Sequence, residues 1–133
     1  MEEKTVFLLI RDGKIALRKR PKTGLLAGLW EFPNVEGALD ESAAGGAVET
    51  MGLTPIDWRS RLTAKHVFTH VEWHMTGYQV LVDELEPMGQ DESLLFVETQ
   101  EIEKNYPIPS AFAAYSAYLR IQTGIQKMKG TTL

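Results

Sequence analysis

The sequence contains no cysteine. This absence excludes disulfides, thiolate zinc sites and cysteine-ligated iron–sulfur clusters from the chain. Long apolar runs are also missing: the run at Val6–Ile10 has five residues, whereas a membrane-spanning helix needs about 20. The first residues, MEEKT, are acidic and lack the apolar core of a signal peptide. We therefore expect a cytoplasmic protein that does not contact a membrane.

The 133 residues are 44% hydrophobic and 24% charged, which is typical of a globular protein. This length suffices for a real core, so we expect a single domain over residues 1–133. The net charge is −4, but the basic residues are uneven, since ten of the 14 Lys and Arg lie in residues 1–66. Six of these fall between Arg11 and Lys22. They indicate either a solvated strand and turn or an edge that faces phosphate.

Runs rich in valine, isoleucine, threonine and aromatic residues predict the strands of this chain. We place them at residues 6–10, 14–20, 30–32, 56–58, 62–68, 71–85 and 94–98. Asp12-Gly13 is a strong signal for a hairpin between the first two strands. The fifth and sixth strands are expected to form a second, longer hairpin. Pro33 and Asn34 are expected to end the third strand.

Two helices are predicted. The first covers Ser42–Met51, although a pair of glycines weakens it and Gly52 ends it. The second begins at Ser110, which can cap it, and carries apolar residues at spacings of three and four: Phe112, Tyr115 and Leu119. Several strands between few helices, with antiparallel connections, predict an α+β protein whose mixed sheet is packed between helices.

His66, His70 and His74 recur every four residues and superficially suggest a zinc site. The local sequence favours a strand, in which residues four apart are separated by about 13 Å. Two nitrogens at that separation cannot both lie about 2 Å from one zinc ion. We therefore interpret them as structural or surface histidines. The sequence also lacks Gly-x-Ser-x-Gly, GxxxxGK[ST] and GxGxxG, which argues against a nucleophile elbow, a P-loop and a Rossmann site.

Residues 28–53 contain a Trp-Glu-Phe-Pro strand, a loop, a short helix and a closing Gly-Leu. This order is similar to the frame of a phosphate-hydrolysing enzyme, whose helix holds Mg²⁺ with several carboxylates on one face. Here the helix carries Glu41 and Glu49, while Gly45 and Gly46 stand where acids or an arginine would serve. We therefore expect that this scaffold binds a ligand and does not cleave it.

Three segments resemble the C-terminal domain of the MutY-type adenine DNA glycosylases: LRKRPKTGLLAGLWEFPNVEG, KHVFTHVEWHM and YPIPSAF. Those enzymes remove adenine mispaired with 8-oxoguanine, and their C-terminal domain is similar to the Nudix hydrolase MutT. The resemblance covers roughly residues 4–120 and implies a Nudix-like α/β/α sandwich with a mixed, mostly antiparallel sheet. In a full Nudix box, an Arg-Glu pair and a Glu-Glu pair would occupy the places of Gly45-Gly46 and Glu49-Thr50.

In the family, a Phe-Ser-His loop after a strand contacts the 8-oxoguanine. Phe68-Thr69-His70 matches this loop, with threonine in place of serine. The resemblance implies that Thr69 supplies the oxygen that contacts the lesion, while His70 supports it or contacts a phosphate. Phe68 is expected to pack the loop. Phosphate contacts are expected from Lys65 and His66 just upstream and from the basic residues Arg18, Lys19 and Arg20.

The resemblance also implies a larger parent enzyme, of which this chain is a fragment. The parent would bind double-stranded DNA with 8-oxoguanine opposite adenine, and would flip the adenine into its own N-terminal catalytic domain. A [4Fe–4S] cluster is expected in that catalytic domain, and no metal, cofactor or catalytic residue is expected in this chain. Alone, the chain is predicted to have no glycosylase activity and to bind DNA weakly. In a bacterium the parent would be associated with the nucleoid.

Two other functions are compatible with the sequence. One is a free-standing Nudix hydrolase that acts on nucleoside diphosphate derivatives, which the sparse glutamates of the helix disfavour. The other is a protein-interaction module that keeps the Nudix fold and binds a partner protein in place of DNA.

Overall fold

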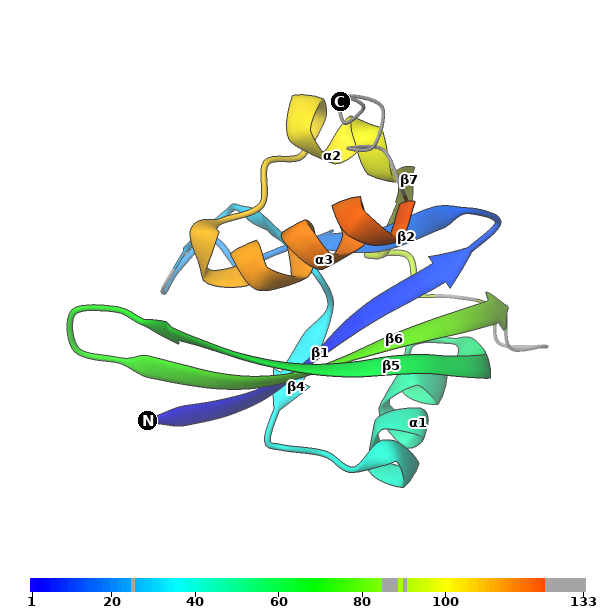
Figure 1. The fold of residues 1–133 in the computed structure, drawn as a ribbon, viewed down its shortest axis with the longest axis horizontal. Helices are drawn as coiled ribbons and strands as arrows, with labels where there is room; N and C mark the ends of the chain where they lie inside the picture. The colour runs from blue at the N-terminus through cyan, green and yellow to red at the C-terminus, as the bar shows by residue number, and fades with distance from the viewer. Residues whose placement is uncertain (25, 85–88, 90, 124–133) are drawn as a thin grey trace.

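The computed structural model describes residues 1–24, 26–84, 89 and 91–123 (Figure 1). Within them, one sheet contains seven strands: β1 (Glu2–Arg11), β2 (Lys14–Lys19), β3 (Trp30–Glu31), β4 (Asn34–Glu36), β5 (Leu53–Val67), β6 (Glu72–Glu84) and β7 (Leu95–Glu98). The described helices are α1 (Glu41–Thr50), α2 (Thr99–Asn105), the 3₁₀ turn η1 (Ser110–Phe112) and α3 (Ala113–Thr123). None of these helices is both long and apolar enough to span a membrane.

The strand order is β3-β2-β1-β6-β5, with β4 paired to β1 and β7 paired to β2. β1 and β6 run parallel, from Glu2 opposite Trp73 to Ile10 opposite Leu81. The other strand pairs are antiparallel. The predicted mixed, mostly antiparallel sheet is therefore confirmed.

Both predicted hairpins are present. Asp12 and Gly13 have positive φ values of 54° and 76°, which suits the tight turn that joins β1 to β2. β5 and β6 form the longer hairpin, whose last paired residues are Val67 and Glu72.

Helices cover both faces of the sheet, with α1 on one face and α2 and α3 on the other (Figure 1). Successive side chains of a strand point to opposite faces, so β1 contributes to two cores. Val6 and Leu8 are buried in the core that includes residues of α3. Phe7 and Leu9 are buried in the core that includes residues of α1. This arrangement confirms the predicted α+β sandwich.

The predicted strands at 56–58 and 62–68 are parts of one long strand, β5. Its pairing with β6 is irregular at two places, near Pro55 and near Trp58. Proline donates no hydrogen bond to a neighbouring strand, and a bulge leaves extra residues unpaired. These interruptions explain why the sequence pattern predicts two strands where the fold has one.

The third strand, β3, ends before Pro33 as predicted, but Asn34 does not end a strand, because the new strand β4 begins there. Asn34 pairs with Val6 of β1. Its side-chain amide donates to the Phe32 carbonyl at 2.8 Å and to Glu31 Oε1 at 2.9 Å. These two bonds hold the short strands β3 and β4 in a fixed bend around Pro33.

At the C-terminal side, α2 was not predicted, and Ser110 does not cap a helix. Ser110 begins η1, where no side-chain hydrogen bond caps the first turn. The apolar face of the following segment is confirmed, because Phe112, Tyr115 and Leu119 are all buried. α2 buries Ile102 against this same core.

Tyr115 joins α3 to the sheet. Its side chain is fully buried, and its hydroxyl donates to the Leu62 carbonyl of β5 at 2.9 Å. Gly77 of β6 lies directly under the ring, since a Cβ there would lie within 3.0 Å of three ring carbons. Burial raises the pKa of the Tyr115 phenol, so its hydroxyl stays protonated as a donor.

Candidate nucleic-acid interface

The hairpin of β5 and β6 carries Phe68-Thr69-His70 at its tip, which projects beyond the rest of the sheet (Figure 1). The Phe68 N–H donates to the Val71 carbonyl at 2.6 Å and closes a tight turn. Thr69 and His70 form the centre of this turn, and both are exposed. A ligand can therefore approach the Thr69 hydroxyl without displacing any part of the core.

Phe68 fixes the base of this turn. Its ring centroid lies 5.0 Å from that of Trp73 and 4.7 Å from that of His66. Trp73 is only 1% exposed and in turn contacts Phe112 of η1, with ring centroids 5.9 Å apart. Contacts from Phe68 to Trp73 and from Trp73 to Phe112 therefore connect the turn that carries Thr69 and His70 to the core.

Lys65 and His66 lie just before the tip on opposite faces of the hairpin, because they are neighbours in a strand. Lys65 is exposed on the α1 side. His66 is half-buried and packs against Phe68, which leaves it less available to a phosphate. Arg61 is also exposed, and it shares the face of Lys65. Arg61 was not identified from the sequence. Its position four residues before Lys65 in β5 indicates that the two side chains share a face.

Arg18 and Arg20 lie on and just after β2 and are bound to a buried carboxylate. Glu31 is 2% exposed. It accepts a hydrogen bond from Arg18 Nε at 3.0 Å and one from Arg20 Nη1 at 2.7 Å. Arg18 Nη2 also donates to the Asn34 carbonyl. Both guanidinium groups therefore have a structural role, and their predicted phosphate contacts stay a prediction.

Trp73 connects this Glu31 cluster to the hairpin. The Arg20 guanidinium carbon lies 5.3 Å from the Trp73 ring centroid, and Lys4 Nζ lies 4.8 Å from it. Lys4 is itself paired with Glu36 at 2.9 Å. Lys19 Nζ lies 5.5 Å from the ring centroid of Trp30. Lys19 is exposed, whereas its neighbours Arg18 and Arg20 are half-buried.

Glu72 and His74 form a pair beside the turn. His74 Nε2 lies 2.7 Å from Glu72 Oε1. The hydrogen bond from His74 is the main reason that the pKa of Glu72 is lowered, and the positive charge of Lys65 adds to it. Since both side chains are partly exposed, the pair shapes the charge of this surface more than it stabilises the fold.

We expect the pKa of Glu72 to rise toward the ordinary glutamate value in a His74→Ala variant. A carboxyl whose pKa is lowered by folding contributes stability above its unfolded pKa, and that contribution is lost as the pH falls through the lowered value. The variant should therefore lose less stability on acidification than the unmodified chain. NMR titration of the Glu72 side chain measures this pKa. His70→Ala is the control and should leave it unchanged, and an unchanged pKa in His74→Ala would contradict the assignment.

The outer face of α1 carries two acids that lie far apart. Glu41 and Glu49 are both exposed, and a separation of eight residues along a helix is about 12 Å. A Cβ at Gly45 would lie 3.5 Å from Trp58 Cζ2, so the indole of β5 packs closely over this part of the helix. Nowhere in the described residues do three or more His, Asp or Glu side chains form a group that could hold a metal ion.

A family model described as the NUDIX domain matches residues 5–117. The chain belongs to the NUDIX domain family. Among solved structures, the C-terminal domain of mouse MUTYH in complex with human PCNA has a TM-score of 0.68 and 18% identity, covering 92% of this chain and 90% of that one. A MutT structure from work on Aliivibrio salmonicida and Vibrio cholerae has a TM-score of 0.66 and 19% identity, covering 91% and 98%. The E. coli ORF135 protein has a TM-score of 0.60 and 24% identity, covering 84% and 82%. These likenesses show the NUDIX fold.

The NUDIX helix of this chain does not fit a magnesium site. Mg²⁺ requires near-octahedral oxygen ligands at about 2 Å. Glu41 and Glu49 stand about two turns apart, and Gly45 and Gly46 supply no ligand between them. The described part of α1 therefore supplies two carboxylates where a magnesium site of this kind needs several.

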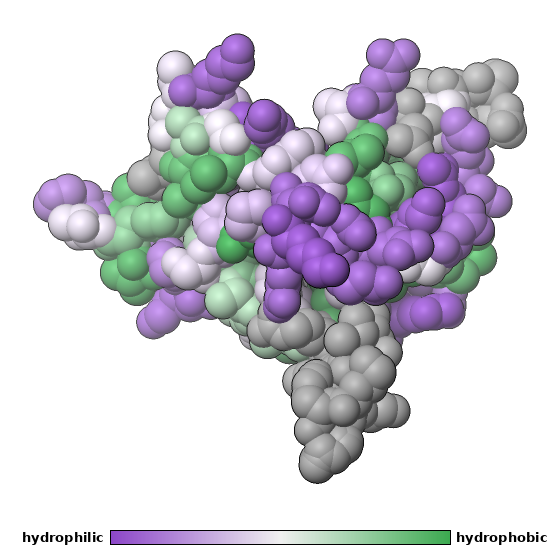
Figure 2. All heavy atoms as spheres, turned by 90° about the horizontal axis from the view of Figure 1, so that it is seen from above, coloured by the Kyte–Doolittle hydropathy of each residue, from purple (hydrophilic) through white to green (hydrophobic). Residues whose placement is uncertain are grey.

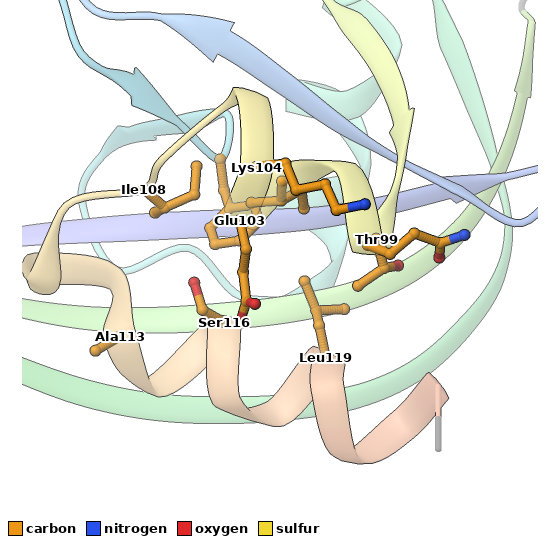
Figure 3. Close-up of a pocket in the computed structure, with 10 residues that line it drawn as sticks. Thr99, Glu103, Lys104, Ile108, Ala113, Ser116 and Leu119 are labelled. Carbon is orange, nitrogen blue, oxygen red and sulfur yellow. The ribbon is translucent and has the colours of Figure 1, made fainter. Parts of the chain in front are cut away.

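A cavity of about 410 Å³ lies between α2 and α3 (Figure 3). Phe32, Ile102 and Leu119 supply apolar walls, and Glu103 and Lys104 of α2 are also among its lining residues. None of its lining residues belongs to the Phe68–His70 turn. The cavity is therefore separate from the predicted lesion-contacting residues.

Proposed function

We propose that this chain is the 8-oxoguanine-recognition domain of an A/G-specific adenine DNA glycosylase, which acts in base excision repair. The observation that carries the proposal is the exposed Thr69-His70 pair at the end of an anchored hairpin. Removal of the mispaired adenine would be the task of the parent's own N-terminal catalytic domain, which would hold the [4Fe–4S] cluster. The partner of this chain would be DNA with 8-oxoguanine opposite adenine, which in a bacterium lies in the nucleoid.

The chemistry of the lesion explains why a hydroxyl at this position is useful. Oxidation at C8 turns guanine N7 from an acceptor into an N–H donor and adds a carbonyl oxygen. The Thr69 hydroxyl oxygen can accept a hydrogen bond from that N–H, which ordinary guanine cannot donate. His70 beside it offers a donor to the new carbonyl or to a phosphate. Phe68 holds the turn in place through Trp73.

Further support comes from the surface around the tip. Seen from the side of α2 and α3, a broad apolar area lies at the end of the molecule that carries the hairpin tip (Figure 2). Val67 beside the turn is 58% exposed on the opposite face of the hairpin. Exposed apolar side chains that cluster at one place are typical of surfaces covered by a partner. The NUDIX helix without a magnesium site and the likeness to the MUTYH C-terminal domain agree with a binding function.

Thr69→Ala in the parent enzyme is expected to reduce the preference for 8-oxoguanine over guanine opposite adenine by about tenfold, because one hydrogen bond to a buried polar group is lost. Single-turnover kinetics on the two duplexes measures this preference. Thr69→Ser is the matched control, since it keeps the hydroxyl and should keep the preference.

An unchanged preference in Thr69→Ala would refute the role of the hydroxyl. The hydrolase alternative is tested separately with the 133-residue chain alone. Magnesium-dependent hydrolysis of 8-oxo-dGTP by that chain would show that it is an enzyme in its own right, and would contradict the proposed binding function.

A further inference from the structure

The α1 side of the β5–β6 hairpin presents two cations in a line that ends at the tip. Arg61, Thr63 and Lys65 are all exposed and share this face, because alternate residues of a strand point the same way. Their partners on β6 run in regular register down to His74 opposite Lys65. The two cations are therefore held about 13 Å apart by four residues of straight strand.

These two cations differ from the other arginines near them. Arg18 and Arg20 are bound to Glu31, and Arg59 is paired with Asp57 at 3.3 Å. Neither Arg61 nor Lys65 has a hydrogen-bond or ion-pair partner among the described residues. Two long, exposed cations that form no ion pair among the described residues are suited to bind an anion that comes from outside the chain, and the charge of Lys65 acts on nearby Glu72 as well.

Two acids lie on the same face, and neither forms an ion pair with Arg61 or Lys65 among the described residues. Glu72 is bound to His74 at 2.7 Å. Glu3 belongs to β1, two strands away from Lys65. A hollow of about 390 Å³ on this face is lined by Thr63, Lys65, His74 and Thr76, and also by Glu3 at its β1 side. This hollow leaves room for a phosphate beside the Lys65 ammonium group.

We propose that Arg61 and Lys65 bind backbone phosphates of the DNA strand whose base meets Thr69. This inference rests on the proposed function and assigns the path of the lesion-bearing strand along the hairpin. One strand of duplex DNA rises about 3.4 Å per nucleotide, so the two cations span about four nucleotides on one side of the lesion. Such contacts position the duplex and carry no base specificity. They place the damaged base at the tip, and Thr69 reads it.

The test measures binding of the 133-residue chain to an 8-oxoguanine–adenine duplex by fluorescence anisotropy over a series of salt concentrations. Each lost phosphate contact should reduce the slope of log affinity against log salt by about 0.9. We expect this reduction in Arg61→Gln and in Lys65→Gln, with the preference for 8-oxoguanine over guanine unchanged. Arg59→Gln removes the same charge from the same strand and is the matched control, with no change in slope expected. Lys104→Gln on α2 is a second control.

Each other outcome has a defined meaning. The inference is overturned if the slopes of Arg61→Gln and Lys65→Gln equal that of the unmodified chain, or if Arg59→Gln and Lys104→Gln reduce the slope equally. It is also overturned if the unmodified chain does not bind DNA at low salt. Failure of the proposed function gives a different result: the slopes fall as expected, but the unmodified chain binds guanine and 8-oxoguanine duplexes equally.

Discussion

Gly77→Ala is expected to destabilise the protein by about 3 kcal/mol, since overpacking of a well-packed core typically costs about 1–3 kcal/mol and this site has no space. The added Cβ would lie within 3.0 Å of three carbons of the Tyr115 ring. That ring has no free space, because Tyr115 is fully buried and its hydroxyl is bonded to the Leu62 carbonyl. Either α3 moves away from the sheet or the hydrogen bond breaks. Urea unfolding monitored by circular dichroism measures the free energy of unfolding.

The same substitution at another glycine serves as the control. Gly46 lies in the middle of α1, is exposed, and has nothing within 4 Å of the place of a Cβ. Gly46→Ala should stabilise the protein by up to about 1 kcal/mol, because alanine favours helix more than glycine does. A double variant isolates the cause: in a Tyr115→Leu background, Gly77→Ala should cost much less. If the cost stays the same there, the clash with the ring is not its source.

The strands and the hairpins could be predicted because their signals are local. Alternating apolar residues and the Asp12-Gly13 turn act over a few neighbouring positions. The position of Phe68-Thr69-His70 between two long strands follows from the same pattern. The parallel pairing of β1 with β6 could not be predicted in this way, because the paired residues Glu2 and Trp73 are 71 positions apart and no local pattern specifies the match.

The short helix α2 was missed for a physical reason. Of its seven residues, Ile102 is the buried one, so residues 99–105 show no apolar periodicity. Helices of this length are not stable alone, and tertiary packing holds them in place. Ile102 reaches the core that also contains Leu119, which lies 17 positions later in the chain. The sequence pattern of the segment itself does not contain that contact.

The candidate site was predicted unevenly. The motif identified Thr69 and His70, and their exposure is consistent with that choice. Charge alone identified Arg18 and Arg20, whose contacts with Glu31 depend on the pairing of β2 with β3. Arg61 was missed because a lone arginine in a strand has no motif around it. Its place on the face of Lys65 becomes visible once the register of β5 is known.

Glu31→Gln should have the second largest effect, a loss of about 3 kcal/mol, because removing one partner from a buried ion pair leaves buried charge uncompensated. Glu31 Oε1 accepts from Arg20 and from the Asn34 amide, and Oε2 accepts from Arg18. A glutamine would direct its own amide hydrogens at one of these donors and would remove the negative charge that faces two cations. Glutamate and glutamine have nearly the same size. The expected loss of stability therefore comes from the lost charge and hydrogen bonds and not from a change in packing. Urea unfolding measures it.

The exposed pair of Asp57 and Arg59 provides the matched control. Its side chains are 57% and 46% exposed, whereas that of Glu31 is 3% exposed. Asp57→Asn removes one carboxylate charge in the same way, but water screens the pair, so the expected loss is below about 0.5 kcal/mol. Equal losses in Asp57→Asn and Glu31→Gln would contradict the structural role of Glu31. A large loss in Glu31→Gln alone would mean that Arg18 and Arg20 chiefly hold β2, β3 and β4 together.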